Sequence, residues 1–172
     1  MIELYTSTTN YFSKKPSFLC TKRRNFMKTA VVWAARLLPF IYMALIWIMS
    51  SLPSNHFVEL PDSQIDRFIK ESLHLIEFAL LYGLFVAASL TGKRKFKRSV
   101  NMLLAVAAAL YGLTDELHQS FYPYRSASLF DLFKDVLGVA VVYYFVDGAL
   151  YQGKFPRFRR LLEKWRGYAG RG

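Results

Sequence analysis

Four apolar runs of about 20 residues each constrain this chain more than any other feature of its sequence. They cover residues 31–52, 73–92, 99–119 and 129–150. A helix rises 1.5 Å per residue, so about 20 residues cross the roughly 30 Å hydrocarbon core of a bilayer. The sequence therefore predicts an all-α fold, an integral membrane bundle of four transmembrane helices. This domain, residues 31–150, would follow a basic polar tail, residues 1–30, and precede a basic amphipathic segment, residues 151–172.

The basic residues are segregated from the apolar runs. The chain is 53% hydrophobic yet carries a net charge of +11, a combination that suits neither a disordered chain nor an ordinary soluble domain. Nineteen Lys and Arg residues, counting Arg36 near the start of the first run, precede that run, separate the second from the third or follow the fourth, against three in the other two connections. The positive-inside rule then puts both termini in the cytoplasm. Nucleic acid is not an expected partner, because the charges flank spans and no nucleic-acid motif is present.

Residues 1–30 lack hydrophobic periodicity, and we expect weak structure there. The lone Cys20 supports neither an internal disulfide nor a cysteine metal site. Residues 22–28, KRRNFMK, resemble a twin-arginine export signal, but the next apolar run is too long for a cleaved signal core, which favours a basic anchor. Residues 62–71 and 155–168 are predicted as amphipathic surface helices, the second facing anionic membrane lipids.

The ionisable residues of the predicted spans gather in one half of the bilayer. The helical rise places Glu77, Asp115 and Asp131 about 21–22 Å from the cytoplasmic ends of their spans. Polar residues three or four apart share a helix face, so three helices can present one polar cluster near the outer surface. The candidate pocket residues are His74, Glu77, Asp115, Glu116, His118, Gln119, Arg125, Asp131 and Asp135.

The cluster carries more negative than positive charge. Its five carboxylates face only Lys134 and Arg125, so shared protons, a bound cation or entering water must relieve the excess. Histidines among carboxylates can ligate a divalent metal such as Zn²⁺, but neither histidine lies in a metalloprotease helix motif. No cofactor is therefore assigned, and a divalent metal stays an alternative. A packing network of inward-facing polar residues is another.

Three blocks of sequence resemble the VanZ-like family. They are residues 48–53 (IMSSLP), 72–78 (SLHLIEF) and 115–119 (DELHQ), the last followed by Phe121, Pro123, Arg125, Ser128, Asp131, Asp135 and Gly138. The family is named for a protein of glycopeptide-resistance gene clusters associated with teicoplanin resistance. The resemblance covers roughly residues 40–150 and implies a multi-pass protein of the bacterial plasma membrane. Two positions depart from the family pattern: Tyr124 replaces the usual glycine, and Glu71 the usual basic residue.

Two functions remain open on these observations. The first is an outward-facing polar pocket that binds a lipid-linked cell-wall intermediate or a glycopeptide and lowers susceptibility to lipoglycopeptides such as teicoplanin. The second is a membrane enzyme, with Asp115, Glu116, His118 and Arg125 doing acid/base work on a lipid-linked phosphate or ester. No motif defines a reaction. A transporter is disfavoured because the ionisable residues of the spans gather in their outer halves.

Overall fold

The computed structural model describes residues 16–52, 63–123 and 128–170. Every regular element in these residues is an α-helix, which confirms the predicted all-α class. The helices are α1 (Pro16–Ser50), α2 (Ser63–Leu90), α3 (Arg98–Gln119), α4 (Leu129–Tyr151) and α5 (Pro156–Ala169).

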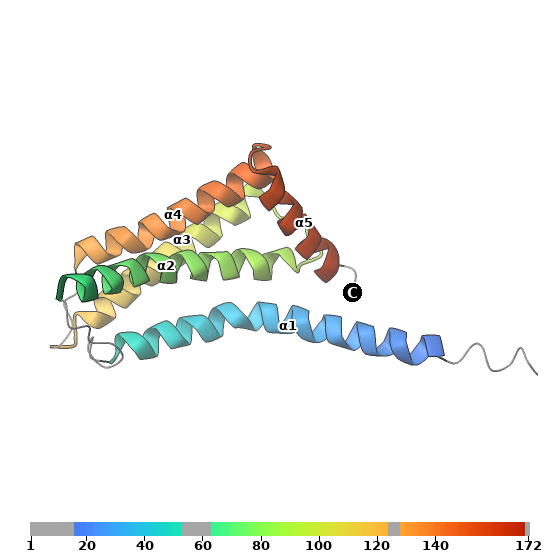
Figure 1. Cartoon of the computed structure of the whole chain (residues 1–172), viewed down its shortest axis with the longest axis horizontal. Coiled ribbons are helices and arrows are strands. Elements are labelled where there is room, and N and C mark those ends of the chain that lie inside the picture. Colours follow the sequence, from blue (N-terminus) through green and yellow to red (C-terminus); the bar gives the residue numbers. More distant parts are fainter. Residues whose placement is uncertain (1–15, 53–62, 124–127, 171–172) are drawn as a thin grey trace, which may run out of the picture.

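The helices α2, α3 and α4 form a bundle, and α1 lies along α2 (Figure 1). The last residues of α1 and α3 and the first residues of α2 and α4 meet at one end, which we call the cluster end. The helix α5 crosses the opposite end, which we call the α5 end. The buried apolar core between the helices centres on Phe78, Leu81 and Tyr82 of α2 and reaches Ile46 of α1 and Val139 of α4.

Polar side chains lie inside this bundle and apolar side chains cover it. Asn101, Asp115 and Asp135 are at most 1% exposed, whereas Phe40 and Leu103 are more than 60% exposed. A soluble bundle shows the reverse pattern, because water would penalise a broad apolar surface. An apolar outside around a polar inside suits a bundle surrounded by lipid.

Three segments are long and apolar enough to cross a bilayer: Phe26–Ser50, Ser72–Leu90 and Arg98–Gln119. They lie in α1, α2 and α3, where three of the four spans were predicted. The helix α4 covers the fourth predicted span and has 23 residues. It carries four charged side chains, those of Asp131, Lys134, Asp135 and Asp147, whereas each of the three segments above carries at most three.

Two helix starts differ from the sequence-based expectations. The helix α1 begins at Pro16, so residues 16–30 continue the first span rather than forming a weakly structured segment. Proline is favoured at the first helical position, where its missing N–H costs nothing. The helix α2 begins at Ser63, so the predicted surface helix over residues 62–71 is not separate but runs on into the second span.

Two glycines let the bundle helices approach closely. A Cβ atom added to Gly138 of α4 would lie 2.1 Å from the carbonyl oxygen of Leu75 in α2. A Cβ atom on Gly112 of α3 would lie 3.2 Å from Cβ of Asp135 and 3.4 Å from the ring of Phe78. Small residues at such crossings allow close backbone packing in membrane bundles. These contacts fix α2, α3 and α4 against one another at the level of the polar cluster.

Residues 155–168 were predicted as a surface helix, and α5 is helical there. Most of its apolar side chains, however, pack on the bundle. The indole Nε1–H of Trp165 donates a hydrogen bond to the carbonyl oxygen of Ala87 at 2.9 Å. Phe158 and Leu162 also pack against the core, while Leu161 is 64% exposed. Most of the apolar stripe thus contacts the bundle, while Arg157, Arg159 and Arg160 are exposed.

Candidate functional site

Adjacent residues on α3 divide the predicted cluster into two parts. Successive residues of an α-helix point about 100° apart, because 3.6 residues make one turn. Asp115 therefore faces α1, and Glu116 faces α4. Within the predicted cluster, the hydrogen bonds and close contacts of the described side chains form two groups on these two sides of α3.

The α1-facing group is centred on a carboxylate with both oxygens hydrogen-bonded. Asp115 is 1% exposed; its Oδ1 accepts a short hydrogen bond from the Ser50 hydroxyl, and its Oδ2 accepts from Gln119 Nε2 at 2.7 Å. One turn along α3, the ring of His118 stacks on Trp47 with the ring centroids 3.8 Å apart. This group ties the end of α1 to α3 through the Ser50–Asp115 hydrogen bond and the stacking of Trp47 on His118.

The second group, which we call the triad, consists of His74 of α2, Glu116 of α3 and Asp135 of α4. One ligand atom from each of the three side chains lies within 4.8 Å of the others. Asp135 is fully buried, and His74 Nδ1 lies 3.8 Å from its Oδ1. Glu116 is also buried, and its Oε2 accepts a hydrogen bond from the backbone N–H of Ser128 at 3.0 Å. Three helices therefore deliver one imidazole and two carboxylates to a single point.

The rim of the cluster carries an ion pair and a helix cap. Lys134 Nζ lies 2.8 Å from Asp131 Oδ1, one turn earlier on α4, and 4.5 Å from the ring centroid of Phe130. Ser128 caps α4, since its hydroxyl accepts a hydrogen bond from the backbone N–H of Phe130 at 3.1 Å. Lys134 thus offsets the charge of Asp131, the residue that lies nearer the helix end.

The remaining candidates are not members of the triad or fall outside the described residues. Glu77 lies one turn after His74 on α2 and is half-buried. His118 does not belong to the triad and lies on a different face of α3 from Glu116, because its ring contacts Trp47 and Tyr122. Arg125 falls outside the described residues, so its predicted place above the acidic helix ends is not tested.

A polar network at the α5 end was missed in the sequence. Arg98 donates two hydrogen bonds of 2.8 Å to the two carboxylate oxygens of Asp147, and Gln152 Nε2 donates to the same carboxylate at 2.7 Å. Asp147 is only 2% exposed. Ionisable residues of the spans are therefore not confined to the cluster end. The sequence did contain a signal for this pair, because Arg98 begins the third span and Asp147 lies near the end of the fourth, so both lie at the same end of the bundle.

A bundle with apolar outer surfaces, polar buried groups and long apolar helices defines the class of helical membrane proteins. A family model described as VanZ/LLP1 matches residues 4–150. The chain belongs to this family, as the three sequence blocks indicated. A search of curated proteins and a search of solved structures each returned no match.

Proposed function

We propose that this VanZ/LLP1 protein spans the bacterial plasma membrane four times with both termini in the cytoplasm, and that its outward-facing polar pocket binds a lipid-linked envelope ligand. Occupancy of that pocket lowers susceptibility to lipoglycopeptides such as teicoplanin. The observation that carries the proposal is the buried acidic and imidazole group at the cluster end, opposite the basic α5 end.

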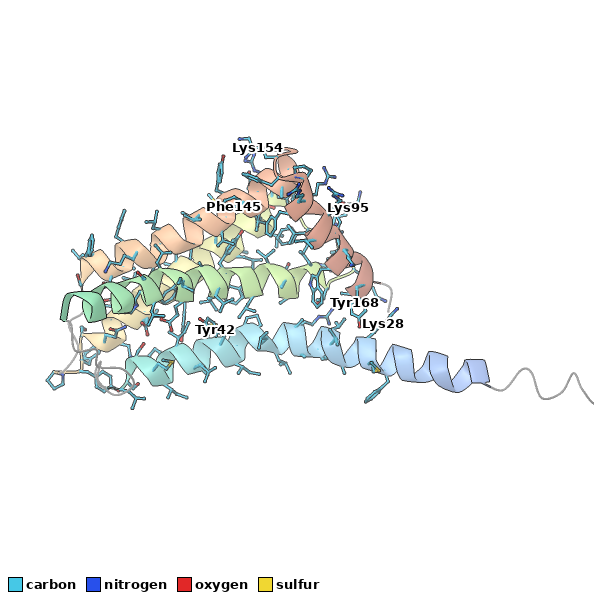
Figure 2. The ribbon with its side chains drawn as sticks, viewed as in Figure 1. Lys28, Tyr42, Lys95, Phe145, Lys154 and Tyr168 are labelled. Atoms are coloured by element: carbon cyan, nitrogen blue, oxygen red, sulfur yellow. The ribbon has the colours of Figure 1, made fainter. Side chains whose placement is uncertain are left out.

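The charge distribution along the bundle supports this orientation. Figure 2 labels Lys28, Lys95 and Lys154, which all lie toward the α5 end. Arg157 and Arg160 of α5 are exposed there as well. Basic residues near span ends favour the cytoplasmic side, where anionic lipids add attraction. The cluster end then faces outward, toward the cell envelope.

The pairing of the charges on α4 supports its role as the fourth span. Asp131 pairs with Lys134 on α4, Asp135 lies in the triad, and Asp147 pairs with Arg98 on α3. The charges of α4 therefore meet charged or imidazole partners, whereas exposed positions such as Val141 are apolar. Charged residues within spans are tolerated when they face the bundle interior and pair there.

The triad is accessible from only part of its surroundings, which suits a binding pocket. The side chain of His74 is 21% exposed, while that of Asp135 is fully buried. A ligand group would therefore reach the triad through His74 and meet the buried carboxylates behind it. Carboxylates in low dielectric attract a cationic or hydrogen-donating group strongly, because water does not screen them.

Teicoplanin susceptibility tests this proposal. A sensitive Gram-positive host would express wild-type protein, Asp135→Asn or the control Thr114→Ala, with membrane levels matched by immunoblot. Thr114 is exposed on the same helix as Glu116 and lies outside the triad. Wild type and Thr114→Ala should raise the inhibitory concentration, and Asp135→Asn should not. Full protection by Asp135→Asn at equal level would refute a role for this pocket.

A second candidate function is acid/base catalysis on a lipid-linked phosphate or ester. The observation that favours it is the approach of His74 to a buried carboxylate, the arrangement that orients an imidazole in many general bases. Purified wild-type protein would then turn over an envelope-lipid substrate, and His74→Gln would not. Absence of turnover across phosphate and ester substrates, with ligand binding retained, would leave only the binding function.

A further inference from the structure

The carboxylate of Asp135 is the most unusual polar group in the bundle. It is fully buried, and neither of its oxygens accepts a hydrogen bond within the described part of the chain. Its one ion-pair partner there is His74, whose Nδ1 lies 3.8 Å away, too far for a hydrogen bond. Burying a carboxylate without donors is costly, and a bound cation is one way to offset that cost.

The neighbouring cation does not fill that role. Lys134 directs its ammonium group to Asp131 at 2.8 Å, although Asp135 is the next residue along α4. Glu116 brings a second buried carboxylate to the same point from α3. The triad therefore concentrates two carboxylates around one imidazole, which is an arrangement that a small divalent cation would stabilise.

The distances suit an ion bound between the three side chains. Zn²⁺ lies about 2.0–2.2 Å from imidazole nitrogen and carboxylate oxygen, so two ligand atoms stand about 3.4 Å apart at the tetrahedral angle and at most about 4.3 Å apart. The 3.8 Å between His74 Nδ1 and Asp135 Oδ1 falls in this range. A pair of ligand atoms at the 4.8 Å limit would have to close by about 1.4 Å to reach the tetrahedral spacing, which side-chain rotation can supply.

The surroundings of the triad hold its ligands in place. The backbone N–H of Ser128 donates a hydrogen bond to Glu116 Oε2, which fixes the position of that carboxylate. Gly112 allows α3 to lie against the Asp135 side chain, because a Cβ atom added to this glycine would lie 3.3 Å from Oδ2 of Asp135. Hydrogen bonds and packing around ligands orient them and contribute to metal affinity.

We propose that His74, Glu116 and Asp135 form a binding site for a divalent transition-metal ion of the zinc class. Imidazole favours zinc, iron, cobalt and nickel over magnesium and calcium, and carboxylates complete a mixed nitrogen and oxygen set. Three protein ligands leave a fourth position for water or for a ligand group. The site concerns metal binding by the chain itself and does not depend on the proposed role in resistance.

Zinc binding to the purified full-length chain tests this site. The protein would carry no polyhistidine tag, and chelator would be removed by dialysis before Zn²⁺ is titrated by calorimetry in mild detergent. Wild type should bind one Zn²⁺ per chain and unfold at a higher temperature with the metal than without it. His74→Gln and Asp135→Asn should each weaken binding at least about 10-fold, because each removes a direct ligand.

The matched control is His118→Gln. His118 lies at the same end of the bundle but stacks on Trp47 outside the triad, so this variant should bind Zn²⁺ like wild type. Co²⁺ provides a second readout on the wild type alone, since a mixed nitrogen and oxygen site of low coordination number gives visible absorption that excess Zn²⁺ abolishes. This readout remains decisive if a triad variant fails to fold.

Three results would overturn the site. They are absence of stoichiometric Zn²⁺ binding by folded wild type, equal binding by His74→Gln, and loss of binding in His118→Gln alone. Teicoplanin protection by a wild type that binds no Zn²⁺ would refute the metal site and leave the proposed function standing. Zn²⁺ binding without protection would refute the proposed function and leave the metal site standing.

Discussion

Replacement of Gly138 by alanine tests how closely the bundle helices are packed. The added Cβ atom would lie 2.1 Å from the carbonyl oxygen of Leu75 and 3.1 Å from its carbonyl carbon. Real Cβ atoms essentially never come within 3.0 Å, so α2 and α4 must separate by about 0.9 Å at this point. The obstacle is backbone and cannot rotate away as a side chain can.

The expected cost follows from that separation. Overpacking a close contact typically destabilises by about 1–3 kcal/mol, and the better helix propensity of alanine returns at most about 1 kcal/mol. The matched control is Gly83→Ala on α2, where the added Cβ meets nothing within 4 Å. Relative to this control, Gly138→Ala should lower the free energy of unfolding by about 1–3 kcal/mol. For a chain of this size, the midpoint would fall by about 2–12 °C.

Thermal unfolding of the three detergent-solubilised proteins, followed by circular dichroism, measures this difference. Gly112→Ala provides an intermediate case, since its closest contact of 3.2 Å is to the side chain of Asp135. From highest to lowest, the expected order of unfolding midpoints is Gly83→Ala, then Gly112→Ala, then Gly138→Ala. A Gly138→Ala midpoint equal to that of Gly83→Ala would show that α2 and α4 do not cross as closely as the structure has them.

Three further predictions concern the α5 end and the topology. Arg98→Gln should lower the melting temperature, because it removes the ion pair of buried Asp147, and the double variant Arg98→Gln/Asp147→Asn should recover part of the loss. Trp165→Phe should cost about 1 kcal/mol in thermal unfolding, because it deletes the hydrogen bond to Ala87; no change would mean that α5 docks through apolar contacts alone. In a Cys20→Ser chain on intact cells, an impermeant thiol reagent should label Ser120→Cys and spare Lys95→Cys. The reverse labelling would invert the proposed topology.

The helices were largely predictable because their signal is local. Runs of about 20 apolar residues mark membrane helices directly, and each predicted span coincides with one of α1 to α4 to within two residues at its C-terminal end. The residues at which α1 and α2 begin were harder to predict. Residues 16–30 lack an apolar pattern of their own and extend a helix whose apolar part begins later. Residues 63–71 continue into α2 because no glycine or proline separates them from the span.

Three of the predicted residues, His74, Glu116 and Asp135, meet in the structure, but their grouping was not predictable from the sequence. Helical spacing showed that His74, Asp115 and Asp135 lie on three helices at one level. Spacing within one helix cannot show which neighbouring helix each side chain meets. The direction of Asp115 toward Ser50, and of Glu116 toward Ser128, depends on how α3 is rotated in the bundle. That rotation is set by crossings such as those at Gly112 and Gly138, which are long-range contacts.

The partition changes which carboxylate is the sharper test of function. Asp115 has both oxygens hydrogen-bonded to Ser50 and Gln119, so its replacement first removes a tie between α1 and α3. Asp135 receives no hydrogen bond within the described residues and lies with two potential ligands in the triad. Neutralising Asp135 relieves a buried charge rather than breaking a bonded one, so it should cost less stability than neutralising Asp115. A loss of function in Asp135→Asn without a loss of stability therefore reports on binding, which the equivalent change at Asp115 cannot do.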